Sequence, residues 1–169
     1  LMEREGLKVV FVDTNVIIEA HRTGCWEALV GSYDVHTVET VAEEAFRGPV
    51  DRPGYISIDA EAFNAKVTTH VVSEAMRAKA LIDFPQLATI DDGERDLLAF
   101  LFCYGRPVVL LSTGDSAAIR CACQLGFKDQ LYALEKLARK GSVQRPFKSW
   151  YTNKHLDSIK TQWTFDTLT

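Results

Sequence analysis

Two short apolar runs constrain the fold of this chain more than any other feature, because each one leads into a turn that carries an acid. Residues 9–12 are VVFV, and Asp13 follows them directly. Residues 108–111 are VVLL, and a Ser-Thr-Gly turn connects them to Asp115. Such runs, bounded by polar turn residues, predict short strands that are buried on both faces. A helix is expected to follow each acid, and a Thr-Asn pair after Asp13 offers caps for the first one.

Predicted strands and helices alternate along the whole chain. A further strand is expected at 33–36, and helices at 16–20, 25–30, 38–46, 60–82 (one or two helices), 94–104, 116–125, 128–140 and 150–163. Wholly apolar strands that alternate with helices favour an α/β fold, with a parallel sheet covered on both faces. The length of 169 residues predicts a single domain, 1–169, with a basic helical extension at about 141–169.

The composition is that of an ordinary soluble protein, with 47% hydrophobic and 25% charged residues. No apolar run is long enough for a membrane span or a signal peptide, so we expect a cytoplasmic protein with no membrane partner. The four cysteines lack zinc-like spacing and are interpreted as reduced, buried thiols. The four histidines are scattered and are interpreted as surface or core residues. The cysteines are Cys25, Cys103, Cys121 and Cys123, and the histidines are His21, His36, His70 and His155.

Charge is divided unevenly between the body and the C-terminal segment. Residues 136–169 carry seven basic side chains against two acidic ones, a net charge of +5, so the first 135 residues carry −9. Such a segment can serve a polyanion, although a charge-balanced surface is the commoner explanation. Trp150, Tyr151 and Trp163 stand among its lysines. They either stack on bases or dock the segment on the body, and we favour docking.

Helical phase separates acids that face the core from acids that face solvent. Glu44 flanks the apolar stripe of its predicted helix, whereas Glu43 points nearly opposite to that stripe. Glu94 shares the face of the next apolar stripe, while Asp96 lies about 200° away and is expected to be solvated. Asp115 begins the following helix, where an acid also suits the N-cap.

Four acids are therefore candidates for one site, and we call them the acid set: Asp13, Glu44, Glu94 and Asp115. Two of them follow parallel strands, whose carboxyl ends form the working crevice of an open α/β sheet. Carboxylates that converge without basic partners repel one another, and a divalent cation removes this repulsion. A site made only of carboxylate oxygens suits Mg²⁺ or Mn²⁺ rather than zinc. Simple capping is the alternative for the two acids that follow strands.

Four segments together resemble the motifs of PIN-domain nucleases. They are residues 9–15 (VVFVDTN), 44–48 (EAFRG), 92–95 (DGER) and 110–115 (LLSTGD). In that family the first acid follows the first strand, the second precedes a glycine by four residues, the third opens a helix and the fourth ends a later strand. The resemblance implies a three-layer α/β/α sandwich around a central parallel sheet of about five strands. The last of these strands should fall near residues 127–132.

The same resemblance implies a Mg²⁺- or Mn²⁺-dependent endoribonuclease, and VapC-type toxins are the largest group in that family. On this hypothesis Asp13, Glu94 and Asp115 bind one cation, while Glu44 ligates it through water or helps a second ion. Hydroxyl and amide side chains would position water or phosphate, namely Thr14, Asn15, Ser112, Thr113 and Ser116. RNA is then the substrate, its products carry 5′-phosphate and 3′-hydroxyl ends, and an antitoxin or a second copy of the chain is a candidate partner.

Two other classes of protein stay open at this point. A catalytically silent PIN-like module would bind RNA or a protein partner, although such a module need not keep four acids. A flavodoxin-like receiver domain also gathers acids at strand ends. The sequence lacks the acidic pair expected after the first strand of a receiver and the lysine expected after a later strand.

Overall fold

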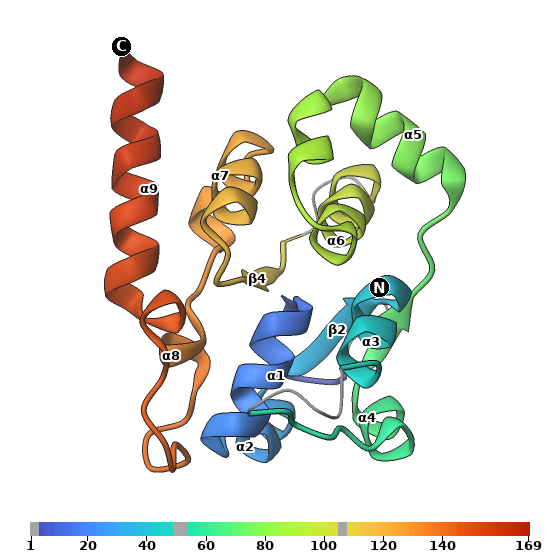
Figure 1. Ribbon diagram of the computed structural model, residues 1–169, viewed down its shortest axis with the longest axis vertical. Helices are drawn as coiled ribbons and strands as arrows, with labels where there is room; N and C mark the ends of the chain where they lie inside the picture. Colours follow the sequence, from blue (N-terminus) through green and yellow to red (C-terminus); the bar gives the residue numbers. More distant parts are fainter. Residues whose placement is uncertain (1–3, 49–53, 105–107) are drawn as a thin grey trace.

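The computed structural model describes residues 4–48, 54–104 and 108–169, which form an α/β fold (Figure 1). Its sheet is entirely parallel and has the strand order β3-β2-β1-β4. The strands are β1 (Val9–Val12), β2 (Asp34–Val38), β3 (Thr68–His70) and β4 (Leu110–Ser112). The predicted α/β class and parallel sheet are confirmed, and the surrounding helices are compatible with a three-layer sandwich.

Helices connect every pair of successive strands. They are α1 (Thr14–Thr23) and α2 (Trp26–Ser32) before β2, α3 (Glu39–Phe46) and α4 (Ala60–Lys66) before β3, and α5 (Glu74–Asp83) and α6 (Asp92–Cys103) before β4. After β4 come α7 (Ser116–Gln124), α8 (Leu134–Leu137) and α9 (Asn153–Leu168). At the left of Figure 1, α9 packs along α7. β3 falls inside the segment 60–82 that was predicted to be helical. It lies at the edge of the sheet and is partly exposed, so it has no apolar run.

The order of the strands changes direction at β1. From β1 the chain moves outward to β2 and β3, and it then returns to add β4 on the other side of β1. Val10 accordingly pairs with Val35 on one side and with Leu110 on the other. Ligands of open parallel sheets bind at the carboxyl ends of the strands where the order reverses. Here these ends belong to β1 and β4, and Asp13 and Thr113 follow them directly.

β1 is the centre of the core, as its apolar run predicts. Val10, Phe11 and Val12 have no exposed surface. The ring of Phe11 contacts Phe100 of α6, with 5.8 Å between the ring centroids. A strand that is buried on both faces has a rigid carboxyl end, so the residue after it is held in a fixed position.

The predicted fifth strand is reduced to one bridge residue, and the helix predicted at 128–140 is broken. Leu131 pairs in parallel with Leu111, but as an isolated bridge. A 3₁₀ helix (Lys128–Gln130) immediately precedes it and α8 begins three residues later, so too few extended residues are left for a strand. The Nζ of Lys160 donates to the Leu131 carbonyl oxygen at 3.0 Å. In the described residues the sheet therefore has four strands rather than five.

The four cysteines are free, and all but Cys103 are buried. Among the helices of the described ranges, none has the length and apolar character needed to cross a membrane.

Candidate active site

Asp13 is fixed at the end of β1 by hydrogen bonds to both carboxylate oxygens. Its Oδ1 accepts from the backbone N–H of Val16 at 2.8 Å, so Asp13 itself is the N-cap of α1, and not Thr14 or Asn15. Its Oδ2 accepts from the hydroxyl of Thr113. The residue is 1% exposed. Each carboxylate oxygen has a second lone pair, so Asp13 keeps capacity for a further ligand.

The turn after β4 supplies the second side of the site. Thr113 is buried and reaches across to Asp13 of the neighbouring strand. Asp115 caps α7, because its Oδ1 accepts from the Ala118 N–H at 2.9 Å. Both acids that follow strands, Asp13 and Asp115, therefore cap a helix, as the alternative explanation predicts. Capping occupies only one oxygen of Asp115, and this carboxylate is exposed to solvent.

Glu44 extends from α3 and links α1 to the start of α6. Its Oε2 accepts from the Thr14 hydroxyl at 2.7 Å, and its Oε1 accepts from the Gly93 N–H at 3.1 Å. A Cβ at position 93 would collide with this carboxylate, so glycine is what lets Glu44 approach the helix backbone. The predicted inward direction of Glu44 is confirmed, and Glu43 is exposed as expected.

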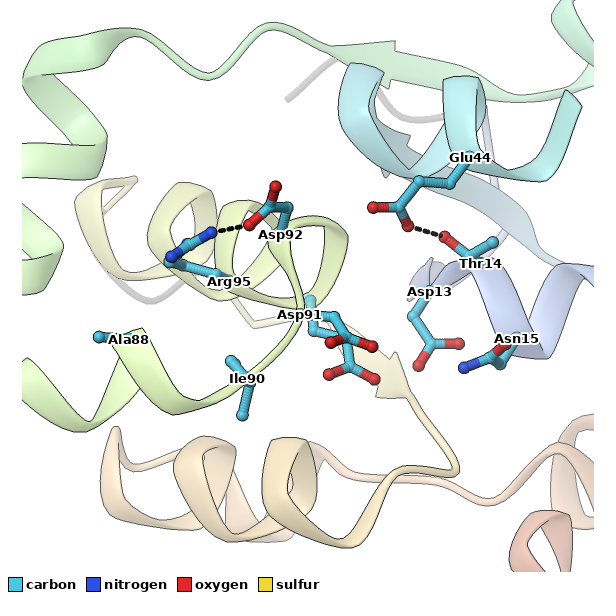
Figure 2. A pocket seen from close by; sticks show the side chains of 10 residues that line it. Asp13, Thr14, Asn15, Glu44, Ala88, Ile90, Asp91, Asp92 and Arg95 are labelled. Carbon is cyan, nitrogen blue, oxygen red and sulfur yellow. Dashed lines mark hydrogen bonds and ion pairs between the residues drawn. The ribbon is translucent and has the colours of Figure 1, made fainter. Parts of the chain in front are cut away.

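Asp13, Glu44 and Glu94 line one pocket of about 480 Å³ (Figure 2), which we call the acidic pocket. Its other residues come from the first turn of α1, from the segment before α6 and from the first turn of α6. They are Thr14, Asn15, Ala88, Ile90, Asp91, Asp92 and Arg95. In Figure 2 the carboxylates of Asp13 and Asp91 extend into the same space. Asp91 stands at the N-cap position of α6, although its side chain makes no capping bond there. It was not among the acids predicted for the site; its position three residues before Glu94, at a helix start, was the signal that could have found it.

Burial, and to a smaller extent the charges of neighbouring acids, raise the pKa values of Asp13 and Glu94. Burial raises the pKa of Asp13 to about 6, although hydrogen bonds from Thr113 and Val16 oppose this rise. Burial raises the pKa of Glu94 to about 8, and the negative charges of Asp13, Asp115 and Asp91 add to the effect. The charges of Asp115 and Glu44 also raise the pKa of Asp13, so all four members of the acid set are electrostatically coupled, as crowded carboxylates should be.

Two basic side chains near these acids in the sequence form ion pairs with other acids. Arg95 forms an ion pair with Asp92, and Arg47 forms one with Glu43. Within the described ranges, no lysine or arginine forms an ion pair with any member of the acid set. In the part of the chain that the structure describes, the acid set therefore has no lysine or arginine as an ion-pair partner.

The prediction from helical phase that Asp96 is solvated is wrong, because Asp96 is buried. It is 3% exposed and accepts from Arg77 Nε and Nη2 at 2.9 Å each, and from the hydroxyl of Thr40. Helix α5 packs on α6 and covers the face that the phase argument assigned to solvent. A bidentate arginine compensates the burial of this charge, so Asp96 is a structural acid.

The four-residue acid set is not gathered in one pocket. Asp115 lies outside the acidic pocket and lines a neighbouring one, together with Ser116. Asn15 lines both pockets and marks their boundary. Of the predicted positioning residues, Thr14 and Thr113 bind acids directly, whereas Ser116 Oγ lies 3.4 Å from His155 Nε2.

Asp34, His36 and His70 form a second cluster of titratable groups, which the interpretation of the histidines as scattered did not predict. His36 is fully buried, with its Nε2 3.1 Å from Asp34 Oδ2 and its Nδ1 2.8 Å from His70 Nε2. The two rings stack near Phe11 and Phe100, and burial lowers the pKa of His70 to about 4. The residues come from β2 and β3, whose pairing the sequence did not reveal. This cluster links β2 to β3 and is not part of the acidic pocket.

The donor chemistry of the acidic pocket fits a hard divalent cation, since every candidate ligand is an oxygen. As the side chains stand in the described residues, however, no three His, Cys, Asp or Glu form a group that could hold a metal ion. Neither a scan against protein-family models nor a search of curated proteins found a match for this chain.

Proposed function

We propose that this chain is a metal-dependent nuclease that hydrolyses RNA at the acidic pocket. The observation that carries the proposal is the pair Asp13 and Glu94. These buried carboxylates have pKa values raised to about 6 and about 8, and neither forms an ion pair in the described residues. Strongly perturbed acids in a pocket are typical of functional sites. Asp13 directly follows β1, where the strand order reverses, and this position supports the same interpretation.

Asp13, Glu94 and Asp115 are the proposed ligands of Mg²⁺ or Mn²⁺, with Glu44 in a supporting role. These side chains must move closer together to bind a cation, because the described side chains do not form a group of three that could hold one. Glu94 and Glu44 have the long side chains that allow such movement. Asp13 is held still by Thr113 and Val16, so it is the fixed ligand toward which the others move.

The bound cation supplies a water of lowered pKa and neutralises charge on the phosphoryl oxygens. The residues of the chain position the reaction. Thr113 holds the carboxylate of Asp13, and Thr14 holds that of Glu44. Hydrolysis joins the water oxygen to phosphorus, breaks the bond to the 3′ oxygen and leaves a proton on that oxygen. The products carry 5′-phosphate and 3′-hydroxyl ends, as the PIN resemblance implies.

The PIN-like architecture belongs to this proposal as well. It is supported by the order of the acid set along the chain and by the parallel sheet, with a bridge at Leu131 in the place of a fifth strand. A three-layer sandwich and the role of a toxin with an antitoxin partner follow from the same resemblance. Co-purification of a small protein encoded beside this chain, with loss of RNA cleavage in the complex, is the expected result for a toxin.

Cleavage of a 5′-labelled single-stranded RNA tests the proposal. Wild type stripped with EDTA should be inactive and should regain activity with Mn²⁺ or Mg²⁺. Asp13→Asn should abolish cleavage, and it should still fold because asparagine also caps helices. Glu44→Gln should lower activity, while its exposed neighbour serves as a matched control, Glu43→Gln. Cleavage that survives both EDTA and Asp13→Asn would disprove the proposal.

A silent PIN-like module that binds RNA or protein is the second candidate. The observation that favours it is that the described side chains form no ready metal-binding group. On this reading wild type binds RNA equally well with EDTA and with Mn²⁺, and never cleaves it. The labelled-RNA assay separates the two functions directly.

A further inference from the structure

The C-terminal segment is tied to α1 by a buried carboxylate. Glu19 is 2% exposed, and its Oε1 accepts from the backbone N–H of Lys148 at 2.9 Å. Arg22 donates to both oxygens of Glu19 and also to the Pro146 carbonyl oxygen, at 2.8 Å. Lys148 therefore has a fixed backbone, while its side chain is free to face solvent.

Two adjacent aromatic residues of this segment have different environments. Tyr151 is 7% exposed and lies against Gly114, where a Cβ would come within 2.7 Å of the tyrosine ring. This contact anchors the segment on the turn between β4 and α7. Trp150, the preceding residue, is 49% exposed. Tyr151 therefore docks the C-terminal segment on the body, whereas the indole of Trp150 is exposed at the surface.

These anchors build a second pocket of about 360 Å³ beside the acidic pocket. We call it the aromatic pocket, and its residues are Asn15, Gly114, Asp115, Ser116, Lys148, Trp150, Tyr151 and His155. It shares Asn15 with the acidic pocket. Asp115 lies on its wall, and the charge of Asp115 acts on Asp13 and Glu94 next door.

The chemistry of the aromatic pocket complements that of the acidic pocket. Lys148 offers an ammonium group, and Ser116 and His155 offer a hydroxyl and a ring nitrogen 3.4 Å apart. These groups can donate to phosphate oxygens, and the flat face of an indole stacks on a nucleobase whatever its sequence. Bases inside a duplex are already stacked and cannot reach such a platform, whereas unpaired bases can.

We propose that the aromatic pocket binds the nucleotide next to the cleaved bond, with its base on Trp150 and its phosphate at Lys148, Ser116 and His155. The inference rests on the proposed nuclease function and adds the substrate class, which is single-stranded RNA. Glu19 is a positioning residue on this account, because it acts through the backbone of Lys148.

Binding measured without catalysis tests this inference separately from the nuclease activity. Asp13→Asn protein in EDTA is titrated with a short labelled single-stranded RNA and with the same sequence as a duplex, by fluorescence anisotropy. The single strand should bind more tightly and should quench tryptophan fluorescence. Adding Trp150→Ala should weaken binding about tenfold, and Trp150→Phe should restore part of it. In the Trp150→Phe protein the quenching should largely disappear, because Trp26 is buried and the partly buried Trp163 packs against the core and does not line the aromatic pocket.

Lys148 and Lys154 provide a matched pair for the phosphate contact. Both are exposed lysines of the C-terminal segment, but only Lys148 lines the aromatic pocket. Lys148→Gln should weaken binding and lower the salt dependence, by about 0.7 in the slope of log K against log salt. Lys154→Gln should change neither.

Equal binding of single strand and duplex, or no loss in Trp150→Ala, overturns the inference. If wild type then still cleaves RNA with Mn²⁺, the proposed function stands without this pocket. If Trp150→Ala loses binding but no form of the protein cleaves RNA, the aromatic pocket stands and the nuclease function fails.

Discussion

At the scale of single residues, two acids of α6 show how partners decide the role of a buried charge. Glu94 and Asp96 are 8% and 3% exposed. Arg77 binds Asp96 through two hydrogen bonds, whereas Glu94 has no ion pair within the described ranges. A buried acid with a basic partner is explained by the fold, whereas an unpaired one with a raised pKa is a candidate for a functional site.

Asp96→Asn is therefore expected to weaken the fold but to leave any response to Mn²⁺ intact. Loss of a charge-assisted hydrogen-bond pair should cost about 1–3 kcal/mol of the free energy of unfolding, measured with urea. Asp83→Asn is the control, because its pair with Lys79 is largely exposed and should be worth less than about 1 kcal/mol. An Asp96→Asn protein as stable as wild type would contradict the structural role.

At the scale of elements, α6 has a glycine, Gly93, in its first turn, where alanine would normally make a helix more stable. Alanine is the better helix former by about 1 kcal/mol. Gly31 in α2 has open space where a Cβ would go, whereas a Cβ at Gly93 meets the carboxylate of Glu44. Gly31→Ala should thus stabilise the protein by up to about 1 kcal/mol in urea unfolding.

Gly93→Ala should bring no such gain, because Glu44 must leave its hydrogen bond with the residue 93 N–H. The same variant should weaken Mn²⁺-dependent cleavage, since it moves one acid of the pocket. Equal stabilisation by the two alanine variants would mean that the Glu44 contact with α6 has no energetic weight.

Elements were predictable where one local pattern decides them. The apolar run of β1 and the acid after it could be predicted directly, because burial on both faces leaves a simple signature. The run 108–111 located β4 only approximately: the strand is Leu110–Ser112, and Val108 before it is 99% exposed. The edge strand β3 carries no such run. Leu131 contacts β4 and Lys160, which are distant in the sequence, so its bridge has no local signature either. Contacts between elements, such as α5 on the outer face of α6, have no local signature, so Asp96 was misjudged.

At the scale of the whole molecule, the C-terminal segment completes a surface that no local pattern predicts. Residues 144–151 bind α1 through Glu19, Arg22 and Thr23, and they contact the turn after β4 through Tyr151. This brings Lys148 and Trp150 beside Asp115. The sequence showed the basic segment and its aromatics but not which of them dock. Tyr151 docks and Lys160 binds a backbone carbonyl, whereas Trp150 is exposed.

The acidic pocket also predicts how stability depends on pH in the metal-free protein. Glu94 has a folded pKa of about 8, raised from 4.5, so the stability from its retained proton is lost as pH rises through about 8. Asp13, with a pKa of about 6, acts the same way at lower pH. His70 has the opposite sign, because its pKa is lowered from 6.5 to about 4 and its contribution is complete above pH 6.5. Between pH 6.5 and 8 the melting temperature in EDTA should therefore fall.

Glu94→Gln isolates the source of this fall, because it removes the titrating carboxyl and its repulsion from Asp13, Asp115 and Asp91. The variant should melt at nearly the same temperature at pH 6.5 and 8, and above wild type at pH 8. Mn²⁺ at about 100 times its dissociation constant should stabilise wild type by about 2.7 kcal/mol, since a cation bound only to the folded site shifts the equilibrium by mass action. Glu94→Gln should lose most of that gain, while Glu43→Gln should behave as wild type in both respects. A wild-type melting temperature that is flat from pH 6.5 to 8 and indifferent to Mn²⁺ would show that these acids do not form a common cation site.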